Sequence, residues 1–331
     1  MRRAAGILVV VAVVGFALPV LGYLKLGSRA GTTTVNLKWN DFPIRYFVTN
    51  RGVSGVTAQQ FQAAMSRAFS TWNAVETAET SSQFAGFTQA PPFDDDDMTV
   101  LGFLDRPELD RVLGATTFLI DVRTGEIVES DIFFNATFPW SVSSAGQTGS
   151  FDLESIAVHE IGHLHGLGHS ALGETEMRSG GRRVLGAEAV MFPIAFTAGS
   201  ISDRTLKADD IAGISDIYPT GVFQRDTGSI SGRVTKNGTG VIGAHIVAFN
   251  PRTGKLVGGF TLTADGAFVI AGLDPGPHVL RAEPLDDGDI ESFFDATLGV
   301  DLNFGAKFHD KLAIVPRGGG TRDIEIKVSP K

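Results

Sequence analysis

Eleven residues in the middle of the chain, HEIGHLHGLGH from 159 to 169, contain four of its seven histidines and constrain the fold more than any other segment. On a helix, positions four apart lie about 40° apart around the axis and roughly 6 Å along it, so His159 and His163 present their imidazoles to one ion. Glu160 lies close to the same face. Gly166 can take a positive φ, which turns the chain and brings His169 back to that ion.

This pattern predicts a zinc site with a general base beside it. Three neutral imidazoles, those of His159, His163 and His169, leave one position of the metal open for a water whose pKa falls to about 7. Glu160 accepts the proton as the water attacks a peptide carbonyl. The alternative, a surface helix with solvated histidines, is disfavoured because random scattering rarely clusters histidines so tightly. His165 points some 160° away from His163, so we expect it in packing or at the surface.

The residues around the motif predict how its helix sits in the fold. Asp152 is a suitable N-cap, and Glu154 falls in the first turn, near the positive end of the helix dipole. Apolar residues form one stripe along the helix, at Leu153, Ala157, Ile161 and Leu164. We therefore expect one side of the helix in the core and the other in a cleft.

Stretches beyond the motif resemble the metzincin clan of zinc peptidases. Residues 189–193, which read AVMFP, look like the methionine turn that follows the zinc helix in that clan. Ser170, directly after the third histidine, is similar to the matrixins, the matrix metalloproteinase type. Residues 113–117, 124–135 and 206–214 resemble matrixin strands and the last matrixin helix. The resemblance covers residues 35 to 219, in the expected order.

The matrixin resemblance implies an α+β fold over residues 35–221, with a twisted mixed sheet and three main helices. It implies that the three histidines named above bind one catalytic zinc ion, with Glu160 as general base and acid. Met191 would form the hydrophobic floor under the metal. Pro193 onward would form one wall of the pocket that receives the side chain following the cut. The alternative for Met191 is ordinary core packing.

Three features depart from the matrixin pattern. The chain has no cysteine, so the thiolate that blocks zinc in many matrixin precursors cannot exist in it. No histidine precedes His159, so a second, structural zinc would find no imidazole ligand, and we predict a single zinc ion. Between His169 and Met191 lies a polar insertion, predicted to be flexible and to form part of the cleft rim, with Arg178, Gly180, Gly181, Arg182 and Arg183.

Upstream of the motif, residue periodicity predicts the other elements of this domain. Trp39 to Thr49 alternates as a strand, and a capping box from Thr57 to Gln60 starts an amphipathic helix. Strand patterns follow over residues 99–104, 116–121 and 126–134. The apolar residues of the helix, at helical spacing, are Phe61, Ala64, Met65, Ala68, Phe69 and Trp72.

Four consecutive carboxylates, Asp94 to Asp97, form the other conspicuous cluster. A hard cation such as Ca²⁺, which prefers oxygen ligands, would relieve their mutual repulsion. The alternative is a solvated acidic loop, which we prefer because no EF-hand-like alternation with a turn glycine is present. Calcium binding is therefore one of two interpretations of this loop.

Beyond residue 221 short β patterns with frequent turn residues predict a second, all-β domain over residues 228–331. Strands are expected at 230–234, 245–249, 259–263, 267–270 and 279–282. Residues 263–280 resemble the carboxypeptidase-regulatory or collagen-adhesin B type repeat, a small immunoglobulin-like sandwich. We expect a spacer or accessory module without catalytic groups. Its histidines are too scattered for a metal site: His245, His278 and His309.

The amino end has the pattern of an export signal. Met1-Arg2-Arg3 precedes an uncharged run from Ala4 to Leu24, which is long enough to span a bilayer. We expect residues 1–30 to be a signal peptide, or an uncleaved membrane anchor through residues 4–24, with the rest outside the cytoplasm. A net charge of −9 argues against nucleic acid as a partner. We expect the exported protein to be a monomer. Its expected partner is a protein or peptide substrate.

Two classes of function follow from these patterns. The first is an exported zinc endopeptidase with Glu160 as the general base. The second is a catalytically inactive surface or adhesion scaffold whose β-sandwich binds a protein or glycan partner. A decayed site is expected to lack a ligand or the base, whereas all four residues are present, which favours the enzyme. A variant of the first class cleaves one dedicated protein, docked by the β domain.

Overall fold

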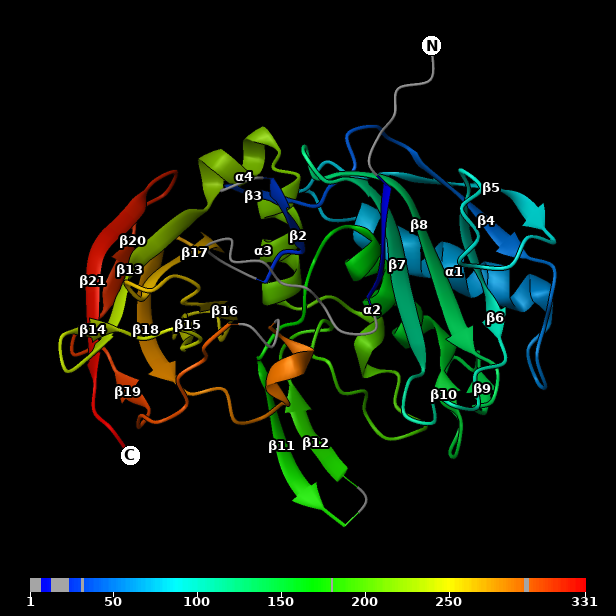
Figure 1. Ribbon diagram of the computed structural model, residues 1–331. Coiled ribbons are helices and arrows are strands. Elements are labelled where there is room, and N and C mark those ends of the chain that lie inside the picture. The colour runs from blue at the N-terminus through cyan, green and yellow to red at the C-terminus, as the bar shows by residue number, and fades with distance from the viewer. Residues whose placement is uncertain (1–6, 13–23, 31–32, 180, 295–297) are drawn as a thin grey trace.

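The computed structural model describes residues 7–12, 24–30, 33–179, 181–294 and 298–331. The chain forms two units side by side, with the amino-terminal unit on the right of Figure 1 and the C-terminal β unit, residues 228–331, on the left. A hairpin of β11 (Gly173–Arg178) and β12 (Gly181–Ala187) projects below the junction between them (Figure 1).

The amino-terminal unit is built on a mixed sheet, as the α+β prediction requires. Its order is β1-β7-β8-β6-β4-β5; β7 is antiparallel to its neighbours β1 and β8, and β8, β6, β4 and β5 are parallel. The predicted strands are present, although β4 begins at Ile44 and not at Trp39. Strand β1 was not predicted as a strand, and β5 was missed because Gly and Ala interrupt its β-forming residues. The bounds are β1 (Ile7–Ala12), β4 (Ile44–Thr49), β5 (Ser82–Thr88), β6 (Thr99–Leu104), β7 (Gly114–Asp121) and β8 (Glu126–Asn135).

Helix α1 (Ala58–Asn73) confirms the predicted capping box and apolar stripe. The Gln60 N–H donates to Thr57 Oγ1 at 3.2 Å, and the Thr57 N–H donates to Gln60 Oε1 at 2.9 Å. All six predicted core residues of the helix are buried. Trp72 also donates its Nε1–H to the Val158 carbonyl at 2.8 Å, which ties α1 to the helix that carries the histidine motif.

Helix α2 (Leu153–Leu164) carries that motif, and its predicted N-cap is confirmed. Asp152 Oδ2 accepts the Ser155 N–H at 2.9 Å, and the Arg204 Nε–H donates to the same oxygen at 2.8 Å. The predicted apolar stripe of α2 is buried against α1 and the sheet. Three further helical segments are described between α2 and the C-terminal β unit, of which only α3 was predicted: η1 (Ser202–Arg204), α3 (Ala208–Ile217) and α4 (Gly221–Asp226).

The polar insertion between α2 and the methionine turn forms a β-hairpin, which the sequence did not predict. Strands β11 and β12 pair antiparallel, and Glu176 lies opposite Arg183, with its carboxylate 3.4 Å from the guanidinium. Cross-strand pairs of opposite charge stabilise such a ribbon. Gly180 lies outside the described residues. Two smaller sheets pair β2 (Gly27–Ala30) with β3 (Thr33–Asn36) and β9 (Trp140–Ser141) with β10 (Phe151–Asp152).

The C-terminal β unit contains two sheets that share one hydrophobic cluster. The first holds β14, β13, β17 and β21, and the second holds β16, β15, β18, β19 and β20. Strand β16 begins three residues before the predicted position, and β14 and β19 to β21 were not predicted. The bounds are β13 (Gly228–Lys236), β14 (Thr239–Gly240), β15 (His245–Phe249), β16 (Leu256–Phe260), β17 (Ala267–Leu273), β18 (Gly276–Glu283), β19 (Lys307–Phe308), β20 (Ala313–Val315) and β21 (Gly320–Val328).

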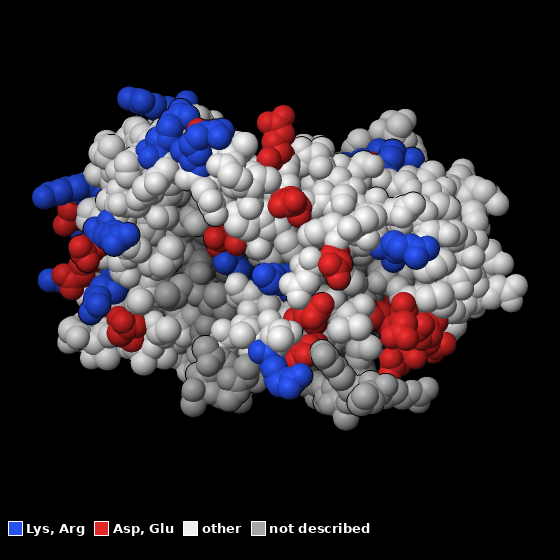
Figure 2. Space-filling view, turned by 90° about the horizontal axis from the view of Figure 1, so that it is seen from above, with Lys and Arg blue, Asp and Glu red and all other residues white. Residues whose placement is uncertain are grey.

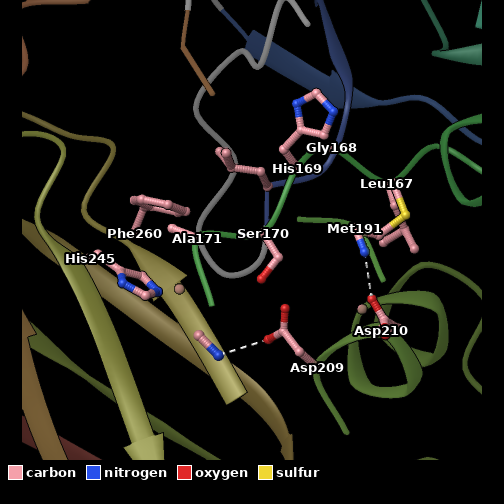
Figure 3. A pocket seen from close by; sticks show the side chains of 14 residues that line it. Leu167, Gly168, His169, Ser170, Ala171, Met191, Asp209, Asp210, His245 and Phe260 are labelled. Carbon is pink, nitrogen blue, oxygen red and sulfur yellow. Dashed lines mark hydrogen bonds between the residues drawn. The ribbon is translucent and has the colours of Figure 1, made fainter. Parts of the chain in front are cut away.

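The two units are docked through apolar side chains and hydrogen bonds. Leu172 and Ala189 of the amino-terminal unit form a buried cluster with Val247 of β15. The Gly258 N–H of β16 donates to the buried Asp209 carboxylate of α3 at 2.7 Å, which is the dashed line to Asp209 in Figure 3. The C-terminal β unit therefore packs directly against the amino-terminal unit, in addition to being joined to it by the chain.

Charge is distributed unevenly between the two ends of the molecule. On the face in Figure 2, basic side chains gather mainly at the end formed by the C-terminal β unit. The largest acidic group on that face lies toward the opposite end. The net charge of −9 is therefore not spread evenly over this face.

Part of the predicted export segment lies within the described residues. Residues 7–12 form β1, which pairs with β7, and residues 1–6 and 13–23 lie outside the description. Among the residues that are described, no helix is long and apolar enough to cross a membrane. The export signal and the membrane anchor stay predictions.

The α1–sheet contact provides a test of the fold. Phe61 is fully buried between Phe103 and Phe134. Phe61→Ala should therefore lower the free energy of unfolding by about 3–5 kcal/mol, because it removes apolar contacts and leaves a cavity. Urea unfolding at constant zinc concentration measures the change. Gln59→Ala on the exposed face of α1 should stay within about 0.5 kcal/mol of wild type, and equal effects of the two substitutions would contradict this packing.

Candidate metal centre

The structure brings the three predicted ligands together. His159 and His163 lie one turn apart on α2, and one ligand atom from each of His159, His163 and His169 lies within 4.8 Å of the others. Gly166 has a φ of +95°, and a Cβ there would come within 2.3 Å of the Leu37 carbonyl oxygen. Only glycine fits this turn without strain, and the turn returns His169 to the helix.

Each of these histidines forms a hydrogen bond between its Nδ1 and a backbone carbonyl oxygen. His159 Nδ1 lies 2.8 Å from the Val190 carbonyl oxygen, and His163 Nδ1 lies 2.8 Å from that of Leu167. His169 Nδ1 lies 2.5 Å from the carbonyl oxygen of Ser292 in the C-terminal β unit. A carbonyl only accepts, so Nδ1 carries the proton and Nε2 keeps a free lone pair.

The free Nε2 atoms fit a metal ion. Those of His163 and His169 are only 3.2 Å apart, and neither carries a hydrogen in this tautomer. Burial lowers the pKa of His159 and, together with the neighbouring histidines, holds that of His163 far below its usual range. Burial likewise lowers the pKa of His169 to about 3. All three are neutral at physiological pH, which is the form that binds zinc.

Glu160 lies beside this cluster and is 5% exposed. Burial raises its pKa to about 7, and a hydrogen bond from the Thr116 hydroxyl, 2.8 Å from Oε2, opposes that rise. A carboxyl that titrates near neutral pH is suited to take up and release a proton. Thr116 was not identified from the sequence, because its role depends on where β7 passes α2.

Met191 lies against helix α2, and its role as the floor under the metal stays a prediction. It is buried, and a Cβ on Gly162 would come within 2.3 Å of its sulfur. The carboxylate of Asp210 on α3 accepts the Val190 N–H at 2.9 Å and the Met191 N–H at 3.1 Å, the latter drawn in Figure 3. The turn that carries Met191 is therefore held from below by α3, a role that the sequence did not reveal for Asp210.

His165 turns away from the metal cluster, as its helical angle predicted. It is fully buried between the rings of Trp72 and Tyr218. Neither ring nitrogen has a hydrogen-bond partner within the part of the chain that is described. Burial lowers its pKa to about 3, so it is a neutral packing residue and not a surface group.

The cluster opens into a cleft of about 640 Å³ whose lining is chemically mixed. Part of the lining is apolar and includes Pro193, whose expected role as a pocket wall stays a prediction. Charged and polar residues also line the cleft, among them Arg182 from β12 and three residues of the C-terminal β unit, Asp289, Glu291 and Ser292. The hairpin thus contributes to the cleft as predicted, through Arg182, whereas a contribution from the C-terminal unit was not predicted. The apolar part of the lining includes Leu113, Phe138, Phe151, Ile156, Phe192, Pro193 and Ile194.

The acidic loop at 94–97 faces two buried carboxylates of β8. Asp131 accepts the Val100 N–H at 2.7 Å, and Glu129 Oε2 is buried without a hydrogen-bond partner among the described residues. Burial and the charge of Asp96 raise the pKa of both carboxyls to about 7. The sequence pointed to the loop but not to Glu129 or Asp131.

Comparison with known proteins agrees with this geometry. The matrixin family model matches residues 38–219. The chain is 30% identical over 196 residues to metalloendoproteinase 2-MMP of Arabidopsis thaliana, covering 52% of this chain and 44% of the relative. It is 33% identical over 177 residues to metalloendoproteinase 1 of Glycine max, covering 48% and 45%. A 29% identity to Arabidopsis thaliana metalloendoproteinase 1-MMP covers 61% and 50%.

The chain spans about half the length of the curated relatives it matches. Among solved structures, the Bacillus anthracis TIE protein is 16% identical with a TM-score of 0.21, covering 32% of this chain and 17% of that one, which is too weak a likeness to support an argument. The matrixin match, by contrast, includes the helix, the three histidines and the methionine turn in one stretch. Because it covers more than half of the 331 residues, the chain belongs to the matrixin family.

Proposed function

We propose that this chain is a zinc-dependent endopeptidase. The observation that carries the proposal is the set of three neutral imidazoles with converging Nε2 atoms beside a buried carboxyl. The names of the matched relatives, all metalloendoproteinases, support the same activity. We also propose, from the sequence, that the protein is exported and acts as a monomer, and that its C-terminal β unit is an immunoglobulin-like sandwich.

In this proposal His159, His163 and His169 would hold zinc through Nε2. When bound there, zinc would supply Lewis-acid chemistry, which polarises a peptide carbonyl and lowers the pKa of a water. Glu160 accepts the proton from that water and later donates it to the leaving amine nitrogen. The hydrogen bond from Thr116 keeps the Glu160 carboxylate oriented. The apolar part of the cleft lining, with Pro193, receives an apolar substrate side chain.

The inactive scaffold is the alternative, and the state of Glu160 argues against it. Burying a carboxyl without a charged partner costs free energy, and here burial raises its pKa to about 7. A scaffold gains nothing from keeping this group beside three neutral histidines. We therefore favour the enzyme.

Glu160→Ala separates metal binding from turnover. The variant should keep one zinc per chain, because the three imidazoles are unchanged, and should lose about 10²–10⁴-fold in kcat because no group accepts the proton. Metal analysis and cleavage of a mixed peptide library measure the two properties. Near-normal turnover in the variant would show that the mechanism is wrong. Zinc without cleavage in wild type as well would favour a scaffold or a single dedicated substrate.

Thr116→Val tests the control of the Glu160 pKa. Loss of the hydroxyl removes a hydrogen bond to the carboxylate, so the pKa rises and the acid limb of the kcat/KM profile moves to higher pH. A hydrogen bond to a charged group is worth about 1.5–3 kcal/mol, so the limb should move by about one to two pH units, with the rate at high pH retained. Thr117→Val, on the opposite face of β7, should leave the profile unchanged. An unmoved limb in Thr116→Val would separate Thr116 from the titrating group.

We further propose that Ca²⁺ binds between the acidic loop and β8. The observation that favours it over a solvated loop is the buried Glu129 oxygen without a partner, close to Asp131. Oxygen ligands of this kind suit calcium, and a bound cation would compensate for the burial of both carboxylates.

Thermal unfolding tests the calcium proposal. Calcium at about a hundredfold excess over Kd should stabilise the zinc-loaded protein by about 2.7 kcal/mol, and a calcium-selective chelator should reverse the effect. Glu129→Gln should lose most of this response, whereas Glu126→Gln on the same strand should keep it. A calcium response equal to wild type in Glu129→Gln would restore the solvated-loop interpretation.

A further inference from the structure

A segment of the C-terminal β unit lies directly against the metal centre. This segment, residues 285–294, follows β18 and contains the short helix η2 (Ile290–Ser292). The Ser292 carbonyl accepts the Nδ1–H of His169 at 2.5 Å, across 123 residues of sequence. The ring of Phe293 also packs edge-on to the His169 ring, with centroids 6.3 Å apart.

His169 differs from the other two histidines in the location of the carbonyl that accepts its Nδ1–H. The acceptors for His159 and His163 are Val190, in the methionine turn, and Leu167, four residues along the chain from His163. Both belong to the amino-terminal unit, whereas the acceptor for His169 belongs to the other unit. Without that acceptor, the His169 ring could rotate or carry its proton on Nε2, and either change removes the lone pair that faces the metal.

The hairpin β11–β12 holds the 285–294 segment in place. The Thr175 N–H donates to Asp287 Oδ1 at 2.7 Å, and the Thr175 hydroxyl donates to the Asp287 carbonyl at 3.0 Å. Arg182 donates to the Asp286 carbonyl at 3.0 Å and lies 3.5 Å from the Asp289 carboxylate. Figure 1 shows η2, in orange, beside the base of this hairpin.

A hydrophobic cluster holds the same segment from the other side. Phe293 and Phe294 are buried, and their neighbours come from both units of the molecule. The position of the Ser292 carbonyl therefore depends on packed side chains and on hydrogen bonds to the hairpin. The cluster consists of Leu24, Ala171, Phe260, Leu262, Leu285, Phe293 and Phe294.

We propose that the C-terminal β unit completes the metal centre, with the Ser292 carbonyl as the positioning group for His169. The Asp287–Thr175 contact keeps that carbonyl in place, so zinc affinity depends on docking between the two units. The inference rests on the proposed function for the identity of the ion. It also gives the hairpin a role, because hydrogen bonds from the hairpin hold the C-terminal unit beside the cleft.

Asp287→Ala in the full-length chain tests this proposal. The variant should bind zinc about 10–100-fold more weakly, the range found when a partner of a metal-binding histidine is lost. Competition with a chromophoric chelator measures the affinity. The Nδ1–H proton of His169 in ¹⁵N-histidine-labelled, zinc-loaded protein should exchange faster with water. Asp265→Ala is the matched control, because Asp265 also anchors a turn of the C-terminal unit, through Thr263 and Ala267.

Two more variants complete the test: Phe293→Ala, and His169→Ala, which removes a proposed zinc ligand. Phe293→Ala loosens the segment from its apolar side and should lower zinc affinity in the same direction. If both variants bind zinc within about twofold of wild type and keep the slow exchange of the His169 proton, the proposal is overturned while the zinc site stands. If His169→Ala itself keeps wild-type zinc affinity, the ligand assignment in the proposed function fails, and the present inference fails with it.

Discussion

Each of the three site histidines donates its Nδ1–H to a main-chain carbonyl, and the three carbonyls come from different parts of the chain. Leu167 lies in the loop after α2, Val190 in the methionine turn, and Ser292 in the C-terminal β unit. These bonds fix the tautomer and direction of each ring before a metal arrives, so less ordering is left for metal binding to accomplish. The fold can be understood as the scaffold that holds these three acceptors in place.

The parts of the fold that sequence predicted are those whose interactions are local. The Thr57–Gln60 capping box, the apolar stripe of α1 and the Asp152 cap of α2 all depend on residues within one or a few turns. Periodicity and capping are visible in such short windows. The histidine motif belongs to the same class, because its spacing alone places two ligands on one face of a helix.

The parts that were missed depend on contacts between distant segments. Thr116 reaches Glu160 only because β7 passes α2, and Ser292 reaches His169 only because the two units dock. No sequence pattern around a threonine in a strand or a serine in a loop indicates such distant partners. The hairpin within the polar insertion was missed for a similar reason: the cross-strand pair of Glu176 and Arg183 becomes visible only when the register is known.

Two adjacent carboxylates at the start of α3 explain how the metal centre and the docking of the units are mechanically linked. Asp210 accepts the amide hydrogens of the methionine turn, while Asp209 accepts that of Gly258 in the C-terminal β unit. Burial raises the pKa of both, to about 6 for Asp210 and about 7 for Asp209, and the hydrogen bonds that each carboxylate accepts oppose that rise. A shift of the C-terminal unit would remove a donor from Asp209 and the acceptor from His169 together. The metal centre is thus held from beneath by Asp210, within the amino-terminal unit, and from the side by Ser292, while the adjacent Asp209 connects the same turn of α3 to the interface between the units.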